Sequence, residues 1–421
     1  MLPRGRVVPF ALMLALGGSV FAAKIEHTNV VEPKMAAPAA PDLSAIGQPT
    51  RLIARGGTLY VAGVGGIAAV SAEGKVLWST PLDPTGVREI TVDDTGIAYT
   101  GYEIVASKTS VWAFLGEMPK KLEFAPSVIG MLAPDGTKTW QASGPASRIS
   151  APCLTPASVA VLLGQTFQIY SRADGKVTVS KVDLDPAMLP NEYAGRMYRP
   201  QPLYVDGNFV GGYFYMIYRL GPNGEEQQVD SQNKTNVVAG PILYKGNMLL
   251  GSYGMAQDGS VNESLVTVLE TKGDFKKVLR KEIADDKSAT GDIVVDGDTI
   301  YASSNFTVSA IDAVAGKRIW DVQGNDGALS AGSMRGVRFA RNFGYRYWGG
   351  HLMIMADDHL YLGTRREIAK KTWADVITVL NKKDGTYVKT IDLKKDIVDM
   401  AVWGDRLLLA TEDGVKYLTL D

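Results

Sequence analysis

The sequence predicts an all-β protein, a single eight-bladed β-propeller of four-stranded antiparallel blades, with a seven-bladed ring as the alternative. The first observation is a recurring phrase of strand, tight turn and strand. It is clearest in residues 311–320, where Gly316 occupies the turn and Trp320 the returning strand. The second is the spacing: the turn glycines from Gly74 to Gly385 span 311 residues in six steps, an average of about 52. That period is typical of propeller blades.

Composition supports one large β body and limits the classes of partner. The 421 residues are 46% hydrophobic and include 45 glycines, enough for a large core and many tight turns. The 44 Lys and Arg residues balance 45 Asp and Glu residues, so no overall positive field attracts nucleic acid, and we expect no nucleic-acid partner. Cys153 is the only cysteine, which excludes an intramolecular disulfide. Any electrostatic recognition must therefore be local.

The N-terminus has the pattern of a signal peptide. Arg4 and Arg6 precede an apolar run at residues 7–16, and Val20-Phe21-Ala22 follows with small residues at the positions that a signal peptidase reads. We expect cleavage after Ala22 and therefore a periplasmic or secreted bacterial protein. The apolar run is short for a membrane span, and no second long apolar run follows it. The mature chain is therefore expected to lack a transmembrane segment.

The repeat divides the rest of the chain into eight units of short strands. The first unit holds strands at residues 51–54, 58–64, 67–71 and 75–80. The next six units are expected at residues 87–140, 150–183, 202–229, 238–282, 290–322 and 347–393. The eighth unit begins at residue 396 and ends after only three strands. We expect no helix of ten or more residues, and one or two helical turns at 365–373 are the exception.

The three-stranded last unit requires a closing segment, because an incomplete blade leaves an open sheet edge. Residues 24–31 alternate well enough for a strand, and residues 32–49 are rich in Ala and Pro. We expect residues 24–31 to form the outer strand of blade eight, linked to blade one by the segment that follows. The predicted organisation is a signal peptide at 1–22, a closing strand and linker at 23–49 and the propeller at 50–421.

Three repeat units end on a tryptophan, and this pattern resembles a known repeat. Trp78 and Trp320 close phrases of the form Gly-Lys-x-x-Trp, and Trp140 closes a variant of it. In this the chain is similar to the pyrroloquinoline-quinone-like (PQQ-like) repeat β-propellers, over nearly all of residues 50–421. The resemblance implies that these tryptophans dock one blade against the next. That family includes quinone-dependent dehydrogenases and non-enzymatic members, such as the propeller subunit of the outer-membrane barrel-assembly machinery.

The residues that the quinone enzymes of that family require are scarce here. The resemblance would imply a vicinal cysteine pair, a metal held by carboxylates and amides, and a catalytic Asp, but Cys153 has no cysteine neighbour. The nearest approaches to a metal or acid–base site are Asp296-Gly297-Asp298 and Asp357-Asp358 beside His359. We interpret both as polar turns between strands. With three histidines and no Gly-x-Ser-x-Gly motif, we predict no catalytic residue, no metal site and no cofactor.

Topology separates the connections between strands into two faces. In a four-stranded meander, the connections between strands one and two and between strands three and four emerge on one face, here called the plain face. The remaining connections emerge on the other, the loop-rich face. Plain-face connections are uniformly tight, and the insertions all belong to the loop-rich face, at residues 103–125, 185–199, 254–262, 324–346 and 364–374. Binding sites on rigid scaffolds concentrate in such loops, so we place the function there.

Arginine and aromatic residues are concentrated in these insertions. Planar cations beside aromatic rings suit carboxylates and are frequent at protein interfaces. The alternative interpretation is that the arginines are solvated or pair with local acids, while the aromatic rings pack on blade edges. The candidate binding residues are Arg196, Tyr198, Arg199, Arg335, Arg338, Arg341, Tyr345, Arg346, Tyr347, Trp348, His351, Arg365 and Arg366.

Two classes of function follow from these patterns. The favoured one is an exported, non-catalytic scaffold that binds a protein partner or an acidic envelope polymer through the loop-rich face. The alternative is an enzyme, either a divergent quinone-dependent dehydrogenase or a glycan-active propeller with its site over the central channel. Carboxylates converging at the channel mouth beside Arg341, Tyr347 and His351 would favour the enzyme.

Overall fold

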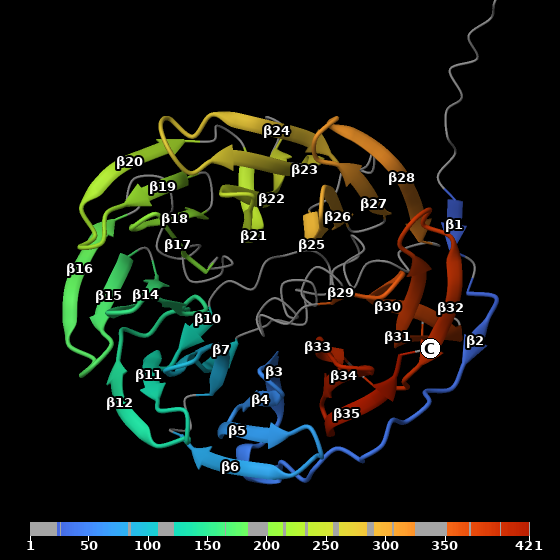
Figure 1. The fold of residues 1–421 in the computed structure, drawn as a ribbon, viewed down its shortest axis with the longest axis horizontal. Coiled ribbons are helices and arrows are strands. Elements are labelled where there is room, and N and C mark those ends of the chain that lie inside the picture. The colour runs from blue at the N-terminus through green and yellow to red at the C-terminus, as the bar shows by residue number, and fades with distance from the viewer. Residues whose placement is uncertain are drawn as a thin grey trace, which may run out of the picture.

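The eight-bladed ring predicted from the sequence is confirmed in the computed structural model (Figure 1). The structure describes residues 23–420 except for 26, 83–85, 108–121, 165, 184–200, 214–215, 232–234, 256–260, 284–289, 305–306, 325–351, 370–371 and 396. The blades are arranged around a central axis, and within each blade the chain runs from the innermost strand to the outermost. In the described part of the chain, the helical structure is a single 3-10 turn, η1 (Ser44–Ile46).

Blades one and two are four-stranded antiparallel sheets. Blade one contains β3 (Pro49–Arg55), β4 (Thr58–Gly63), β5 (Gly66–Ser71) and β6 (Val76–Pro81). Blade two contains β7 (Val87–Asp93), β8 (Gly96–Gly101), β11 (Val128–Leu132) and β12 (Lys138–Ser143). A separate hairpin of β9 (Ile104–Ser107) and β10 (Leu122–Phe124) is inserted between β8 and β11.

Blades three to five repeat the four-stranded meander. Blade three contains β13 (Cys153–Leu154), β14 (Ser158–Leu163), β15 (Thr166–Ser171) and β16 (Val177–Asp183). Blade four contains β17 (Leu203–Val205), β18 (Asn208–Tyr213), β19 (Met216–Leu220) and β20 (Glu226–Ser231). Blade five contains β21 (Thr235–Tyr244), β22 (Asn247–Met255), β23 (Val261–Glu270) and β24 (Lys277–Glu282).

Blades six to eight include the incomplete last unit. Blade six contains β25 (Thr290–Asp296), β26 (Thr299–Ser304), β27 (Thr307–Asp312) and β28 (Lys317–Gly324). Blade seven contains β29 (Met353–Ala356), β30 (His359–Ala369), β31 (Thr372–Asn381) and β32 (Tyr387–Asp392). Blade eight has only β33 (Ile397–Trp403), β34 (Arg406–Thr411) and β35 (Gly414–Thr419), as expected.

The helical turns expected at residues 365–373 are wrong. The β30 and β31 strands continue through this segment as a long antiparallel hairpin, with Arg365 opposite Asp375 and Arg366 opposite Ala374. The backbone groups of the two strands pair across the hairpin, which leaves none of them for a helical ladder.

An N-terminal segment closes the ring, but residues 24–31 do not pair with blade eight as expected. The β1 strand (Ala23–Ile25) adds in parallel to β28 of blade six, and β2 (Val30–Val31) adds in parallel to β32 of blade seven. Residues 24–31 therefore extend blades six and seven. On blade eight, Met35 forms an antiparallel bridge with Leu418 of β35. The segment passes three blades on its way to blade one and pairs with each outer strand in turn (Figure 1). We call residues 23–48 the N-terminal strap.

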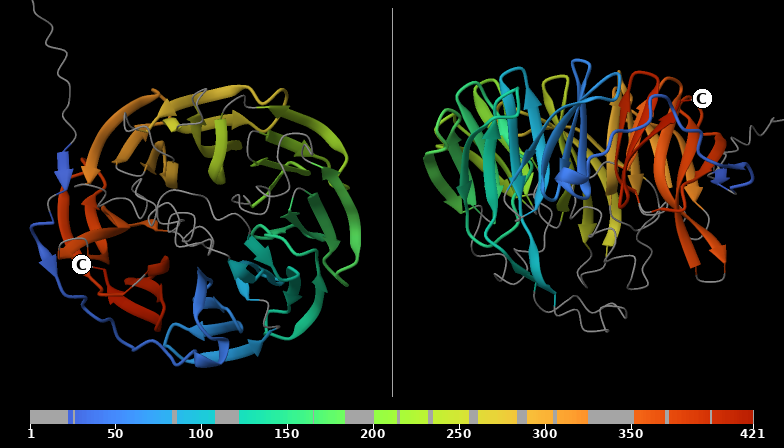
Figure 2. Two further views of the ribbon diagram at one scale, coloured as in Figure 1. Left: turned by 180° about the vertical axis from the view of Figure 1, so that it is seen from behind. Right: turned by 90° about the horizontal axis from the view of Figure 1, so that it is seen from below.

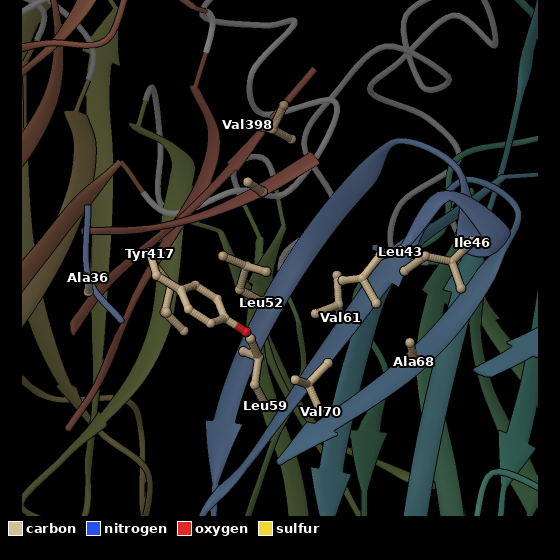
Figure 3. Packing of buried hydrophobic residues seen from close by; sticks show 12 residues of the cluster. Ala36, Leu43, Ile46, Leu52, Leu59, Val61, Ala68, Val70, Val398 and Tyr417 are labelled. Carbon is tan, nitrogen blue, oxygen red and sulfur yellow. The ribbon is translucent and has the colours of Figure 1, made fainter. Parts of the chain in front are cut away.

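The strap also fills the core between blades eight and one (Figure 3). Its Leu43 and Ile46 side chains pack with Val61 and Val70 of blade one and Tyr417 of blade eight in a single hydrophobic cluster. Ile46 is completely buried, and burying such a side chain contributes about 1.5–3 kcal/mol. The closing joint is therefore held by packing as well as by edge pairing.

Tryptophans dock blades together, as the repeat implied. Trp78, Trp140 and Trp320 lie on the outer strands of blades one, two and six. Their indole N–H groups donate to carbonyls in the last turn of the following blade: those of Pro134 at 3.1 Å, Arg172 at 2.8 Å and Lys382 at 3.1 Å. Each buried or half-buried ring also lies flat against the glycine of that turn.

The turn glycine leaves the space that the indole occupies. A Cβ atom on Gly385 would lie 2.6 Å from Trp320, and one on Gly136 would lie 2.5 Å from Trp78. Other joints use smaller side chains against the same position, because Val179 faces Gly224 and Pro38 of the strap faces Gly74. The turn glycine is thus needed for its positive φ and for contact with the preceding blade.

Candidate functional site

The turns of the plain face are tied to one another by ion pairs. Each pair joins a charged side chain of one blade to a turn of its neighbour, which links five of the eight joints. The pairs are Arg55–Asp94 at 2.9 Å, Lys272–Asp206 at 3.1 Å, Lys382–Asp296 at 2.7 Å, Arg172–Asp93 and Lys245–Asp298. Such pairs at the surface contribute at most about 1 kcal/mol each. Their consequence is that many plain-face charges already have partners within the ring.

The two acidic motifs considered as metal or acid–base sites are turns. Asp296 pairs with Lys382, and Asp298 pairs with Lys245 and accepts a hydrogen bond from the Tyr244 hydroxyl at 3.0 Å. Asp357-Asp358 is the connection between β29 and β30, and the Asp358 carbonyl accepts the backbone N–H of Lys382 at 2.7 Å. Among the residues that the structure describes, no group of three or more His, Cys, Asp or Glu side chains is placed to hold a metal ion.

The loop-rich face carries hairpins that project beyond the ring. Figure 2 shows β9–β10 and β30–β31 projecting beyond the ring on the face opposite the short turns. The β22–β23 hairpin of blade five also turns on this side, because it joins the second and third strands of its blade. The two faces therefore differ in relief as the sequence predicted.

A cluster of two buried arginines and two aromatic rings lies at the base of the β9–β10 hairpin. The Arg88 and Arg148 guanidinium carbons lie 5.7 and 6.0 Å from the centre of the Tyr102 ring, and the Phe124 ring is 6.0 Å away. Arg88 donates a hydrogen bond from Nε to the Tyr102 carbonyl at 3.2 Å. Burial lowers the pKa of Arg88 to about 10. Planar cations against an aromatic ring fix the base of this hairpin to blades two and three.

A charged cluster connects the inner strands of blades eight, one and two. Arg51 of β3 lies 3.6 Å from the Glu89 carboxylate of β7 and 3.3 Å from the Asp399 carboxylate of β33. Asp399 is fully buried and also accepts the Leu52 backbone N–H at 2.7 Å. Burial raises the pKa of Glu89 and the nearby Arg51 lowers it. The effect of burial is the larger, so the pKa is raised to about 7. The cluster ties the closing joint together on its inner side.

Further polar side chains form hydrogen bonds between neighbouring blades near the axis. Asp375 of blade seven accepts the Ile397 backbone N–H of blade eight at 3.2 Å, and Asp292 of blade six accepts the Leu352 backbone N–H at 2.6 Å. Gln201 donates to the Pro152 carbonyl at 2.7 Å. Such contacts satisfy backbone groups that a blade cannot satisfy within its own sheet.

The structure locates only part of the predicted binding site. Arg365 and Arg366 are on β30, in the hairpin that projects from the loop-rich face. The other candidate binding residues lie outside the described residues: Arg196, Tyr198, Arg199, Arg335, Arg338, Arg341, Tyr345, Arg346, Tyr347, Trp348 and His351. Whether carboxylates gather beside Arg341, Tyr347 and His351 likewise falls outside the described part of the chain.

Sequence reasoning missed both buried charged groups, Arg88–Tyr102–Arg148 and Arg51–Glu89–Asp399. For Arg51, Arg88, Glu89 and Asp399 the available signal was a charged residue inside a strand that also carries apolar residues, since charged residues are rarely buried without partners. In the described part of the chain, no helix is long and apolar enough to cross a membrane.

The comparisons with known proteins identify the architecture. No family model and no curated protein matches the chain, so the resemblance to PQQ-like repeats stays a prediction. Among solved structures, BamB from Moraxella catarrhalis is similar with a TM-score of 0.59 at 12% identity, over 92% of this chain and 97% of that one. The computationally designed Ika8 protein has a TM-score of 0.58 at 11% identity, over 92% and 100%. Saccharomyces cerevisiae Sqt1 has a TM-score of 0.54 at 9% identity, over 92% and 99%.

These similarities support the fold alone. A natural bacterial protein, a designed protein and a yeast protein match the chain nearly equally well, and none exceeds 12% identity. Unrelated functions are often built on one propeller architecture. The function must therefore be argued from the surface of this chain.

Proposed function

We propose that this protein is an exported, non-catalytic propeller scaffold of the bacterial envelope that binds a protein partner through its loop-rich face. The observation that carries the proposal is the difference between the two faces. Plain-face turns are short and ion-paired to one another, whereas hairpins project from the opposite face. Projecting segments on a rigid ring are where binding residues concentrate.

The similarity to BamB extends over nearly the whole of both chains and supports the ring on which such a surface would be built. The PQQ-like repeat family that the sequence resembles includes non-enzymatic propellers. The arginine and aromatic residues of residues 335–351, together with Arg365 and Arg366, give the face its proposed chemistry. Arginine and aromatic side chains anchor many protein interfaces, and their carboxylate partners would make binding sensitive to salt. An acidic envelope polymer is the alternative ligand for the same chemistry.

A charge reversal tests this proposal. Replacing Arg338, Arg341 and Arg346 together by Glu is expected to abolish capture of the partner in a pull-down from envelope extract. A matched variant replaces three exposed lysines at plain-face turns, Lys75, Lys317 and Lys383, by Glu and should capture it normally. Equal capture by both variants, or loss in both, would contradict recognition by the loop-rich face.

The non-catalytic part of the proposal has its own test. Purified protein incubated with pyrroloquinoline quinone and calcium should show no saturable binding and no reduction of an electron-accepting dye. Saturable binding with dye reduction would replace the scaffold by a dehydrogenase.

A further inference from the structure

The outer rim of the ring already accepts added strands. The β1 and β2 strands of the N-terminal strap pair in parallel with the outer strands of blades six and seven, and Met35 bridges to the last strand of blade eight. After blade eight the strap reaches blade one, where η1 lies against β5 and β6. Figure 1 shows the strap following the rim from β1 to β6.

The β6 strand is the next outer edge around the ring, and it ends its sheet. Its only strand partner in the described part of the chain is β5. Two large apolar side chains on it are exposed, Val76 at 41% and Leu77 at 55%. Exposed backbone groups and apolar side chains on such an edge are a template for pairing with another chain.

The β6 strand also lacks the charges that protect an edge. Its sequence, Val76 to Pro81, contains no charged residue. The corresponding outer strands of blades two to five each contain at least one: Lys138 in β12, Lys181 and Asp183 in β16, Glu226 and Asp230 in β20, and Lys277, Arg280, Lys281 and Glu282 in β24. Lysines and other charges on an outer edge oppose unwanted strand pairing.

We propose that the outer edge of β6 is a docking site for an extended, uncharged segment of a partner protein, which adds to blade one as a fifth strand. The segment would continue the girdle that the strap forms on blades six, seven and eight. Backbone hydrogen bonds would supply much of the affinity, and Val76 and Leu77 would contact alternate side chains of the segment. Pro81 ends the usable edge, because it has no backbone N–H, so the site spans residues 76–80.

The size of the edge favours a flexible segment over a second copy of this chain. Five paired residues make an edge about 17 Å long, and an added strand lies about 5 Å beside it, so this pairing alone buries far less than the roughly 1,200 Å² typical of stable interfaces between folded proteins. A flexible segment of a larger partner needs no such area, since the remainder of that partner can bind elsewhere. The site lies apart from the loop-rich face. A failure of this proposal would therefore leave the proposed function unaffected, and the reverse is also true.

The test uses a fluorescent seven-residue peptide of alternating threonine and valine, with a peptide of alternating threonine and glutamate as its charged match. The uncharged peptide should bind the full protein and slow amide hydrogen exchange at residues 76–80, and the charged one should bind at least about tenfold more weakly. The variant Leu77→Lys with Ser79→Lys should weaken binding about tenfold or more. Both positions are exposed, so the unfolding midpoint should be unchanged.

The control variant is Val177→Lys, at a valine that is 50% exposed on β16 of blade three. It should bind the uncharged peptide as the unmodified protein does. Absence of protection at residues 76–80, equal protection of β12 and β16, or equal weakening by Val177→Lys would overturn the proposal. Light scattering that shows a dimer which Leu77→Lys dissociates would overturn it too, and would assign the edge to a second copy.

Discussion

The joint between blades six and seven and the joint between blades eight and one solve one packing problem in two ways. In the first, Trp320 lies on Gly385, and both residues belong to the repeat. In the second, the blade has no fourth strand, and Pro38 of the strap lies on the equivalent Gly74. The strap then adds Leu43 and Ile46 to the core. A joint made by the repeat connects two blades that follow each other in the sequence. The closing joint instead uses a segment from the other end of the chain.

Removing the strap should break the closing joint. Deleting residues 23–46 removes Ile25, Leu43 and Ile46 from buried positions, each of which contributes about 1.5–3 kcal/mol. We expect the free energy of unfolding, measured by urea titration, to fall by about 5 kcal/mol or more, which is comparable to the whole stability of many domains. Deleting only residues 23–33 should cost about 2 kcal/mol, because the residues between blades eight and one remain. Equal midpoints for the two deletions would contradict this account of closure.

Trp320 tests the joint that the repeat makes. Trp320→Ala removes a buried ring and should lower the free energy of unfolding by about 3–5 kcal/mol. Trp320→Phe keeps an aromatic ring but loses the hydrogen bond to Lys382, so it should cost less, with about 1 kcal/mol from that bond. If the two variants were equally unstable in urea titration, ring packing would not be the basis of the joint.

Glu89 tests the inner side of the closing joint through pH. Its pKa in the folded protein is about 7, above the ordinary 4.5, so the folded protein binds this proton more tightly than the unfolded chain. The resulting stability is fully present below about pH 4.5 and is lost as the pH rises to about 7, a total of about 3 kcal/mol.

The variant Glu89→Gln should lack this pH-dependent loss. Urea titrations at pH 4, 6 and 8 should therefore show the two proteins diverging as the pH rises, with the variant the more stable at pH 8. Parallel pH profiles would show that the pKa of Glu89 is the same in the folded protein as in the unfolded chain.

The smallest effect separates the two roles of a turn glycine. Gly385 and Gly246 have nearly the same φ, 74° and 77°, but a side chain on Gly246 would meet no atom within 4 Å. Gly246→Ala should cost about 1 kcal/mol through its φ alone. Gly385→Ala should cost about 1–2 kcal/mol more, because a methyl group there displaces Trp320. Thermal unfolding of the two variants checks this difference, and equal costs would leave the glycine with only a conformational role.

Much of the fold was predictable because short sequence patterns determine it. The turn glycines and strand alternation locate the eight blades, and Gly-Lys-x-x-Trp locates the docking at Trp78 and Trp320. The partners of the strap were not predictable in detail, because two-residue and three-residue strands carry too little pattern to select a blade. The contact of Arg51 with Asp399 joins residues 348 apart, and no local period indicates it. The candidate binding residues at 335–351 remain a prediction, since their loop interrupts the repeat.

The N-terminal strap also sets the order in which the ring can be assembled. The β1 and β2 strands and Met35 precede every blade in the sequence, yet their partners β28, β32 and β35 belong to the last three blades. These pairings cannot form before blades six to eight are present. Contacts between such distant segments carry a large loop-closure cost and slow the folding of β proteins. Closing the ring therefore requires the two ends of the chain to meet, and we expect this step to limit the rate of folding.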